Sequence, residues 1–174
     1  MDTPEAARET GLGSYAYVEA PFDSCLRLLA EDPAAVLVPA TVEAAEVARA
    51  ISTSLGLERD GHAVAAEVVP VVGAFEPTAL TSGALALTWT SNGARPLLFP
   101  HLEARLAVAA IVLDPPLTRV RISASYSPPS DVLAAGAERQ ALRRMAEAAL
   151  HRLTTEIADG LRRRHEALGI GEVL

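Results

Sequence analysis

Residues 137–164 read AERQALRRMAEAALHRLTTEIADGLRRR, and this stretch decides the fold. Apolar side chains recur in it every three or four residues, which places them on one face of an α-helix. They are Leu142, Met145, Ala149, Leu153, Ile157 and Leu161. A helix over these residues would be roughly 40 Å long, enough to cross a whole sheet. Its apolar face needs a partner, and only the preceding part of the chain can provide one.

Six stretches that favour β-strand precede this helix. They cover residues 14–20, 47–57, 64–75, 85–90, 101–113 and 119–126. Short turn-like connections between successive strands are typical of an antiparallel meander. Residues 22–30 predict a short helix after the first strand, and residues 34–39 predict a second short turn of helix. The sequence therefore predicts an α+β domain in which an antiparallel sheet of about six strands wraps around the long C-terminal helix.

Composition limits the classes of function. The chain has 174 residues, of which 50% are hydrophobic and 21% are charged, as in an ordinary globular domain. The formal net charge of −7 argues against sequence-independent nucleic-acid binding and gives no attraction to anionic membranes. All 15 basic side chains are arginines. Schiff-base chemistry and a lysine-containing phosphate loop are therefore excluded.

Cysteine and histidine usage predicts neither a disulfide nor a metal site. Cys25 is the only cysteine, and the four histidines lack the i, i+4 spacing of a metal-binding pair on a helix. No apolar run is long enough to span a bilayer, and residues 1–13 read as a flexible polar leader without a signal core. We expect a cytoplasmic protein without cofactor, without nucleic-acid partner and without stable membrane insertion. The sequence leaves its oligomeric state open.

Alternation along the fifth predicted strand defines two exclusive faces. His101, Glu103 and Arg105 share one face, where they could form an acid–base group if they pointed into a cavity. Leu102, Ala104, Leu106 and Val108 share the other. Because the C-terminal helix offers Leu, Ile, Met and Ala, only the apolar set matches it without stranding charges. We expect the polar set to face solvent.

Two aromatic residues are candidates for ligand contacts. Trp89 shares a strand face with Leu85 and Leu87, and it either lines a cavity or packs as ordinary core under the helix. Tyr126 follows Ile122 on one face of the last strand. Its hydroxyl either binds a ligand oxygen or stabilises the junction with the helix.

Other polar features have weaker functional interpretations. Glu67 is the only charge between His62 and Phe75, so it is either a buried carboxylate with a raised pKa or a solvent-facing partner of an arginine such as Arg49. Residues 162–164 form a basic run that we interpret as stabilising the C-terminal end of the helix.

Three local patterns in this order resemble the START-like superfamily, which includes polyketide cyclases and lipid-transfer domains. The first is Tyr17-Val-Glu-Ala-Pro21 followed by Glu31-Asp32-Pro33. The second is Leu87-Thr-Trp89 followed by Leu98-Phe99-Pro100 and the strand Leu102-Glu-Ala-Arg-Leu106. The third is Tyr126-Ser-Pro128-Pro129 just before the helix. The resemblance covers nearly the whole chain and predicts a single START-like, helix-grip domain over residues 14–174.

The resemblance implies a deep apolar cavity between the sheet and the terminal helix, and it does not imply one chemistry. Our first hypothesis is binding of a hydrophobic small molecule such as a lipid, a polyketide or an isoprenoid-like compound. The second is an aromatase/cyclase-type enzyme acting in the same cavity. The third is a co-chaperone-like module that binds a protein through the outer sheet face. The predicted cavity-lining residues are Leu87, Trp89, Leu106, Val108, Ile122, Tyr126, Met145 and Leu153.

Overall fold

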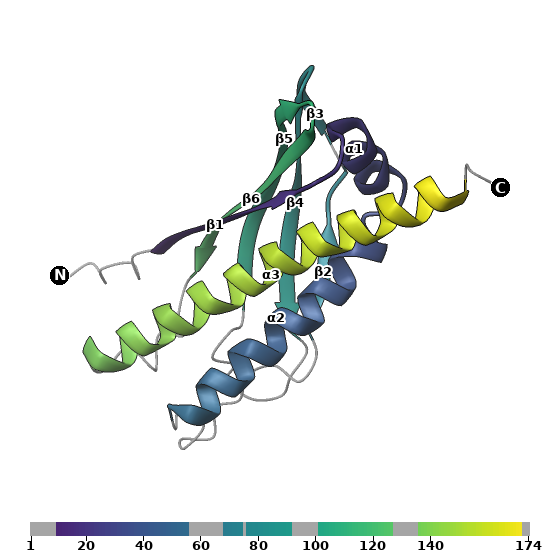
Figure 1. Cartoon of the computed structure of the whole chain (residues 1–174). Helices are drawn as coiled ribbons and strands as arrows, with labels where there is room; N and C mark the ends of the chain where they lie inside the picture. Colours follow the sequence, from purple (N-terminus) through teal and green to yellow (C-terminus); the bar gives the residue numbers. More distant parts are fainter. Residues whose placement is uncertain (1–9, 56–67, 75, 92–100, 127–135, 172–174) are drawn as a thin grey trace.

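The computed structural model describes residues 10–55, 68–74, 76–91, 101–126 and 136–171 (Figure 1). Two helices follow the first strand, five further strands come next, and a long helix ends the described chain. The elements are β1 (Thr10–Val18), α1 (Phe22–Glu31), α2 (Ala34–Ser54), β2 (Val68–Val72), β3 (Glu76–Ala79), β4 (Ser82–Ser91), β5 (His101–Leu113), β6 (Pro116–Tyr126) and α3 (Gly136–Gly171). None of the described helices is long and apolar enough to cross a membrane.

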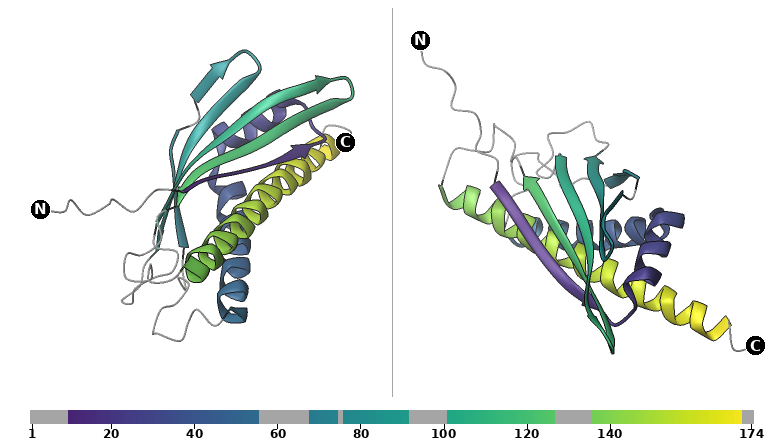
Figure 2. Two further views of the ribbon diagram at one scale, coloured as in Figure 1. Left: turned by 90° about the vertical axis from the view of Figure 1, so that its left-hand side faces the viewer. Right: turned by 90° about the horizontal axis from the view of Figure 1, so that it is seen from above.

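The strands that the structure describes belong to one antiparallel sheet with the order β1-β6-β5-β4-β2, and β3 pairs with β4. The sheet is curved, and α2 and α3 lie side by side on its inner side (Figures 1 and 2). The chain therefore has a helix-grip fold, and the predicted antiparallel sheet of about six strands around a C-terminal helix is confirmed.

The hydrophobic core lies between the inner face of the sheet and the helices. In β6, Val120, Ile122 and Tyr126 are buried, whereas Arg121 and Ser123 between them are exposed. The helix α3 contributes the residues that its spacing predicted, and they are fully or almost fully buried: Leu142, Met145, Ala149, Leu153, Ile157 and Leu161. The two-residue period of the strands and the helical period of α3 thus meet in one core.

The prediction for residues 47–57 was wrong, because residues through Ser54 belong to the 21-residue helix α2. The predicted short turn over residues 34–39 is only the start of this helix. Alanine is frequent in α2, which favours a helix, and the apolar positions recur at helical spacing. Packing of that face against α3 decides between the two periods (Figure 1).

Pro39 lies inside α2, and its effect on the helix is compensated by α3. Proline has no N–H, so the carbonyl oxygen of Ala35, four residues earlier, loses its usual partner. The Arg164 side chain donates to this oxygen at 3.1 Å.

Our interpretation of residues 162–164 as the end of the helix was wrong, because α3 continues to Gly171. Arg162 pairs with Glu166 further along the helix at 2.9 Å.

Two further boundaries differ from the sequence-based expectation. Strand β1 begins at Thr10, inside the segment that we interpreted as a leader, and it pairs with β6 over its whole length. Residues 76–79 lie outside the six predicted strands and form the short strand β3 next to β4. Leu80 and Thr81 form the turn between them.

Candidate functional site

The predicted cavity-lining residues meet on the inner side of the sheet. Seven of the eight have side chains no more than 2% exposed, and all seven belong to one hydrophobic cluster: Leu87, Leu106, Val108, Ile122, Tyr126, Met145 and Leu153. Trp89 lies in β4 opposite Pro70 and Leu102, and its side chain is outside the described part of the structure. That these residues contact a ligand stays a prediction.

The polar face of β5 points away from this cluster. Glu103 and Arg105 are exposed, whereas Leu106 and Val108 are buried and Ala104 is half-buried. The apolar residues of β5 therefore lie on the inner face of the sheet. The side chain of His101 and all of Glu67 lie outside the described residues.

Helix α2 adds a wall with small side chains that the sequence analysis did not predict. Its buried residues include Ala40, Ala44, Ala45 and Ala48, which occupy little volume. Because β-branched residues in its second half alternate with others, that half resembled a strand. The three- and four-residue spacing of its small residues was the signal that could have identified it.

Two buried hydroxyl groups on α2 have no hydrogen-bond partner among the described residues. They are Oγ1 of Thr41 and Oγ of Ser52, and both residues are fully buried. A buried donor without a partner costs free energy, so it usually marks a site that something else satisfies.

The helical geometry of α2 shows which way these hydroxyls face. Val36 packs beside Gly160 of α3, where a Cβ added to that glycine would lie 3.3 Å from Cγ1 of Val36. At about 100° per residue, Thr41 and Ser52 lie roughly 140–160° around the helix from Val36. The other packing neighbour of α2 is strand β2. Both hydroxyls therefore lie on a different side of α2 from Val36.

Acid–base groups are few in the interior. Among the described residues, the buried polar side chains are all hydroxyls, from Thr41, Ser52, Thr118 and Thr154. Burial raises the pKa of the Cys25 thiol from 9.0 to about 11, and a hydrogen bond with Thr118 acts in the opposite direction. Burial also raises the pKa of Tyr126 well above its ordinary value. Both groups stay protonated at neutral pH.

One end of the molecule carries an apolar pocket beside this interior. It has a volume of about 390 Å³ and lies between α1 and the turn that joins β3 to β4, at the end where these elements meet in Figure 1. Phe22 and Leu26 line it from α1, and Leu80 lines it from the turn. Leu80 and Leu113, at the tips of two β-hairpins, are 99% and 80% exposed.

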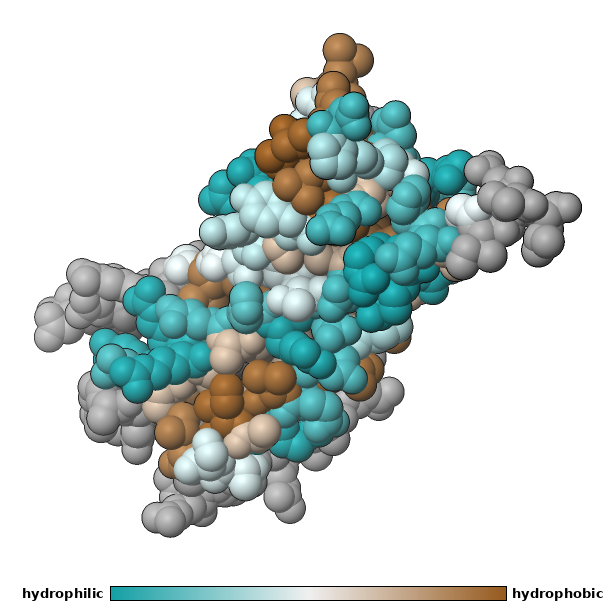
Figure 3. All heavy atoms as spheres, in the orientation of Figure 1, coloured by the Kyte–Doolittle hydropathy of each residue, from teal (hydrophilic) through white to brown (hydrophobic). Residues whose placement is uncertain are grey.

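Exposed apolar surface is found at the tip of the sheet and on α2. Figure 3 shows hydrophobic surface at the tip of the sheet and over α2, with hydrophilic surface between them. Exposed apolar residues on α2 include Val38 and Val42. Phe22 belongs both to the pocket at the tip and to the core cluster, so the pocket adjoins the interior.

Comparison with known proteins finds similarity only at the level of structure. No family model matches the chain, and no curated protein matches it. The Zhui aromatase/cyclase from Streptomyces sp. R1128 is 13% identical, covers 91% of this chain and 94% of its own, and has a TM-score of 0.42. A conserved protein from Geobacillus kaustophilus is 6% identical, covers 88% and 96%, and has a TM-score of 0.46.

A third structure, of a protein from Thermus thermophilus, is 10% identical, covers 87% of this chain and 97% of its own, and has a TM-score of 0.41. All three overlaps are loose. The helix-grip fold of this chain is therefore defined by its own strand order and by the position of α3 across the sheet.

Proposed function

We propose that the protein binds a hydrophobic small molecule between the inner face of the sheet, α2 and α3. The observation that carries this proposal is the chemistry of the enclosed face. Its described side chains are apolar, and two of its few polar groups, the hydroxyls of Thr41 and Ser52, lack partners among the described residues. Apolar walls with a small number of polar groups are typical of sites for small organic ligands.

The two hydroxyls indicate the kind of ligand. A mostly apolar molecule with one or two oxygen atoms would satisfy them and bury its hydrocarbon part against Leu87 and Leu106. A polyketide, an oxidised isoprenoid or a lipid has this composition. A purely hydrocarbon ligand would leave both hydroxyls unpaired, which is unfavourable in a buried site.

Binding fits this interior better than acid–base catalysis does. An aromatase/cyclase-type enzyme needs a proton donor and a proton acceptor beside its substrate. The buried groups described here that can ionise, Cys25 and Tyr126, both have raised pKa values. Neither is a base at neutral pH, so the carrier function is our conclusion.

Nile red, a neutral apolar dye, is the appropriate first probe, because it has no charge that could bind surface arginines. We expect its fluorescence to rise on binding, with a dissociation constant in the micromolar range. Leu106→Trp should reduce binding at least about fivefold by placing a bulkier side chain on the inner face of the sheet, a loss of roughly 1 kcal/mol. Glu103→Gln, on the outer face of the same strand, is the matched control and should leave the affinity unchanged.

A second variant covers the case in which Leu106→Trp does not fold. Thr41→Val removes a hydroxyl without changing the shape of the side chain. It should weaken the binding of an oxygen-containing ligand that is extracted from the purified protein and identified by mass spectrometry. Dye binding that is absent in the wild type, or equal loss in Glu103→Gln and Leu106→Trp, would refute the proposal. Conversion of an extracted polyketide by the protein would establish the cyclase function instead.

The apolar pocket at the tip of the sheet is the proposed entrance. Leu26 lines this pocket from α1 and is only partly buried, so it is accessible to an arriving ligand. Leu26→Trp should slow the association of Nile red in stopped-flow mixing and leave the equilibrium affinity almost unchanged. If the substitution obstructs only the entrance, the association and dissociation rates should fall by the same factor. A change in affinity without a change in the association rate would contradict the role of this pocket as the entrance.

A further inference from the structure

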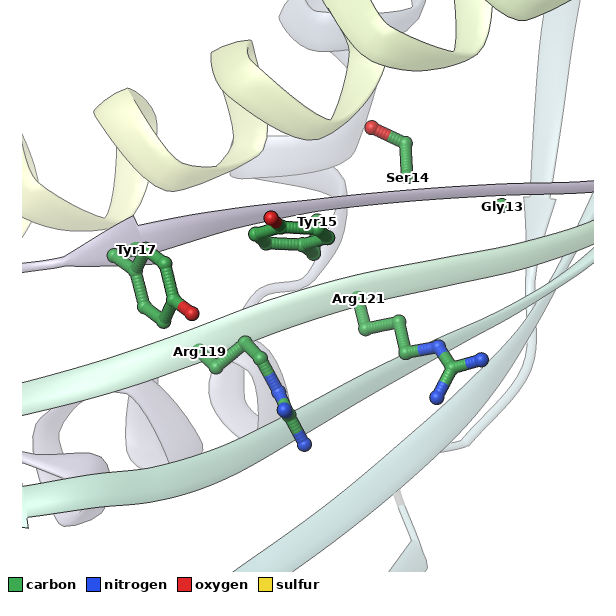
Figure 4. Close-up of a pocket in the computed structure, with 6 residues that line it drawn as sticks. All are labelled: Gly13, Ser14, Tyr15, Tyr17, Arg119 and Arg121. Carbon is green, nitrogen blue, oxygen red and sulfur yellow. The ribbon is translucent and has the colours of Figure 1, made fainter.

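The outer face of β1 and β6 carries a second pocket that the interior site does not use. It has a volume of about 320 Å³ and is lined by Gly13, Ser14, Tyr15, Tyr17, Arg119 and Arg121. Figure 4 shows both tyrosines and both arginines on the side of the strands that faces away from α3, and Ser14 pointing toward α3. The sheet itself separates this pocket from the core.

The two tyrosines are exposed although they are large and aromatic. Tyr15 is 61% exposed and Tyr17 is 52% exposed. Their rings meet edge to face, with centroids 5.7 Å apart and an angle of 71° between the planes. A tyrosine side chain has only two rotatable torsions, so little conformational entropy is lost when a partner covers these rings.

Each tyrosine lies directly opposite an arginine on the neighbouring strand. Tyr15 pairs with Arg121 and Tyr17 pairs with Arg119 in the register of β1 and β6. On the other side of β6, Arg119 and Arg121 lie opposite Ala109 and Ala107 of β5. The alanine side chains are small, and Arg121 is exposed while Arg119 is half-buried.

These two arginines differ from most arginines of α3. Arg143, Arg152 and Arg162 each form ion pairs with a carboxylate, at distances of 2.8–2.9 Å for their closest partners. Within the part of the chain that the structure describes, neither Arg119 nor Arg121 has an ion pair. The protein has a net charge of −7, so two such cations on one face form a local charge opposite in sign to the whole.

We propose that this tyrosine–arginine surface, Tyr15, Tyr17, Arg119 and Arg121, docks an acidic polypeptide segment of a partner protein. Carboxylates would bind the guanidinium groups, whose planar forks match them. An apolar or aromatic side chain between the carboxylates would cover the tyrosine rings. Tyrosine and arginine are among the residues that carry most binding energy in protein interfaces.

The shape of the pocket favours a polypeptide over a free small molecule. Sites for small ligands bury most of the ligand, whereas this pocket lies on the open face of two adjacent strands. Its polar groups are spaced along the strands, as successive side chains of an extended peptide are. Because the two arginines are positively charged, a complementary partner segment is negatively charged.

The test uses a fluorescein-labelled peptide with the sequence Glu-Glu-Trp-Glu-Glu and the full-length protein, measured by fluorescence anisotropy. The wild type should bind it, and the affinity should fall as the salt concentration rises, because exposed charge pairs are screened. The double variant Arg119→Gln/Arg121→Gln should lose about fivefold or more in affinity, as two exposed ion pairs predict. Tyr15→Ala should also weaken binding at unchanged net charge.

The matched control is Arg139→Gln/Arg144→Gln, which removes the same charge from exposed positions on α3. It should change the affinity less than about twofold, within the range of long-range screened charge effects. Unchanged thermal unfolding midpoints show that the variants are folded. A peptide Gln-Gln-Trp-Gln-Gln should bind weakly.

Four outcomes would overturn the proposal. They are failure of the wild type to bind the acidic peptide at low salt, equal loss in both double variants, binding of indole-3-acetate as tight as that of the peptide, and self-association of the wild type that Arg119→Gln/Arg121→Gln abolishes. The third would indicate a site for small aromatic acids and the fourth an interface between two copies of this chain. None of them bears on Nile red binding, which reports the inner face.

Discussion

The two faces of strand β6 have opposite chemistry although their residues alternate along one segment. Val120, Ile122 and Tyr126 point inward, where helices cover them and no charge is described. Arg119 and Arg121 point outward, where they line an open pocket with two tyrosines. The two faces of this strand therefore differ in chemistry, while the backbone between them is fixed by hydrogen bonds on both sides.

The buried and the exposed residues of β6 are therefore expected to have different roles. The inner face contributes its apolar side chains to the core, so we expect changes there to affect stability and the proposed ligand binding together. We expect residues of the exposed outer face to contribute less to stability than residues of the core do. Measurements on matched residues of the two faces should separate these roles.

The largest effect is expected on the inner face. Leu153→Ala should destabilise the protein by about 2–5 kcal/mol, because Leu153 is fully buried in α3 and the truncation leaves a cavity. Arg121→Ala on the outer face should change stability by less than about 0.5 kcal/mol. Urea denaturation of both variants measures the difference. Equal losses would mean that the outer face is as strongly packed as the core.

The second effect concerns pH and the buried thiol. Burial favours the neutral form of Cys25 and raises its pKa from 9.0 in the unfolded chain to about 11. The resulting stability is fully present below pH 9 and is lost as the pH rises toward 11, because the unfolded chain then gains by ionising first. The loss should be on the order of 2 kcal/mol.

Tyr126 also has a raised pKa, so the effect of the Cys25 thiol must be separated from that of the tyrosine. Cys25→Ala should be less stable than the wild type at about pH 8, and the difference should shrink between about pH 9 and 11. Denaturant midpoints at several pH values provide the measurement. A difference that is constant with pH would show that Cys25 is accessible to solvent or already ionised in the folded protein.

The third effect concerns the unpaired hydroxyls of α2. Thr41→Val replaces a buried hydroxyl that lacks a described partner by a methyl group of similar shape, so the ligand-free protein should become more stable, by about 1 kcal/mol. Thermal unfolding of ligand-free protein measures it, and Thr53→Val at an exposed position of the same helix is the control. A loss of stability in Thr41→Val would show that its hydroxyl has a partner.

The inner face was predictable from the sequence because its signals are local. Alternation in β5 and β6 and the helical period of α3 each lie within one segment, and the same residues that satisfy the period are buried. Helix α2 was predicted only at its start. Val47, Ile51 and Thr53 are β-branched and alternate with smaller residues, which favours a strand locally. Contact with α3, far away in the sequence, decides for a helix.

The outer pocket was not predictable because it depends on register between distant segments. Tyr15 and Arg121 are far apart in the sequence, and only the pairing of β1 with β6 brings them opposite each other. A shift of one residue in this pairing would move the arginines away from the tyrosines. The unpaired hydroxyls of Thr41 and Ser52 were likewise invisible, because burial without a partner is a property of the packed interior.

The smallest change in stability is expected from a substitution on the outer face. Tyr17→Ala removes the edge-to-face contact with Tyr15 and the cross-strand neighbour of Arg119, and such pairs stabilise a sheet by about 0.2–1 kcal/mol. We therefore expect a loss of about 0.5 kcal/mol in urea denaturation, unchanged Nile red affinity and weaker binding of the acidic peptide. This combination distinguishes recognition from support of the fold. If Tyr17→Ala instead weakened Nile red binding as much as peptide binding, the sheet would transmit changes between its faces, and the two surfaces would have to be treated as one coupled site.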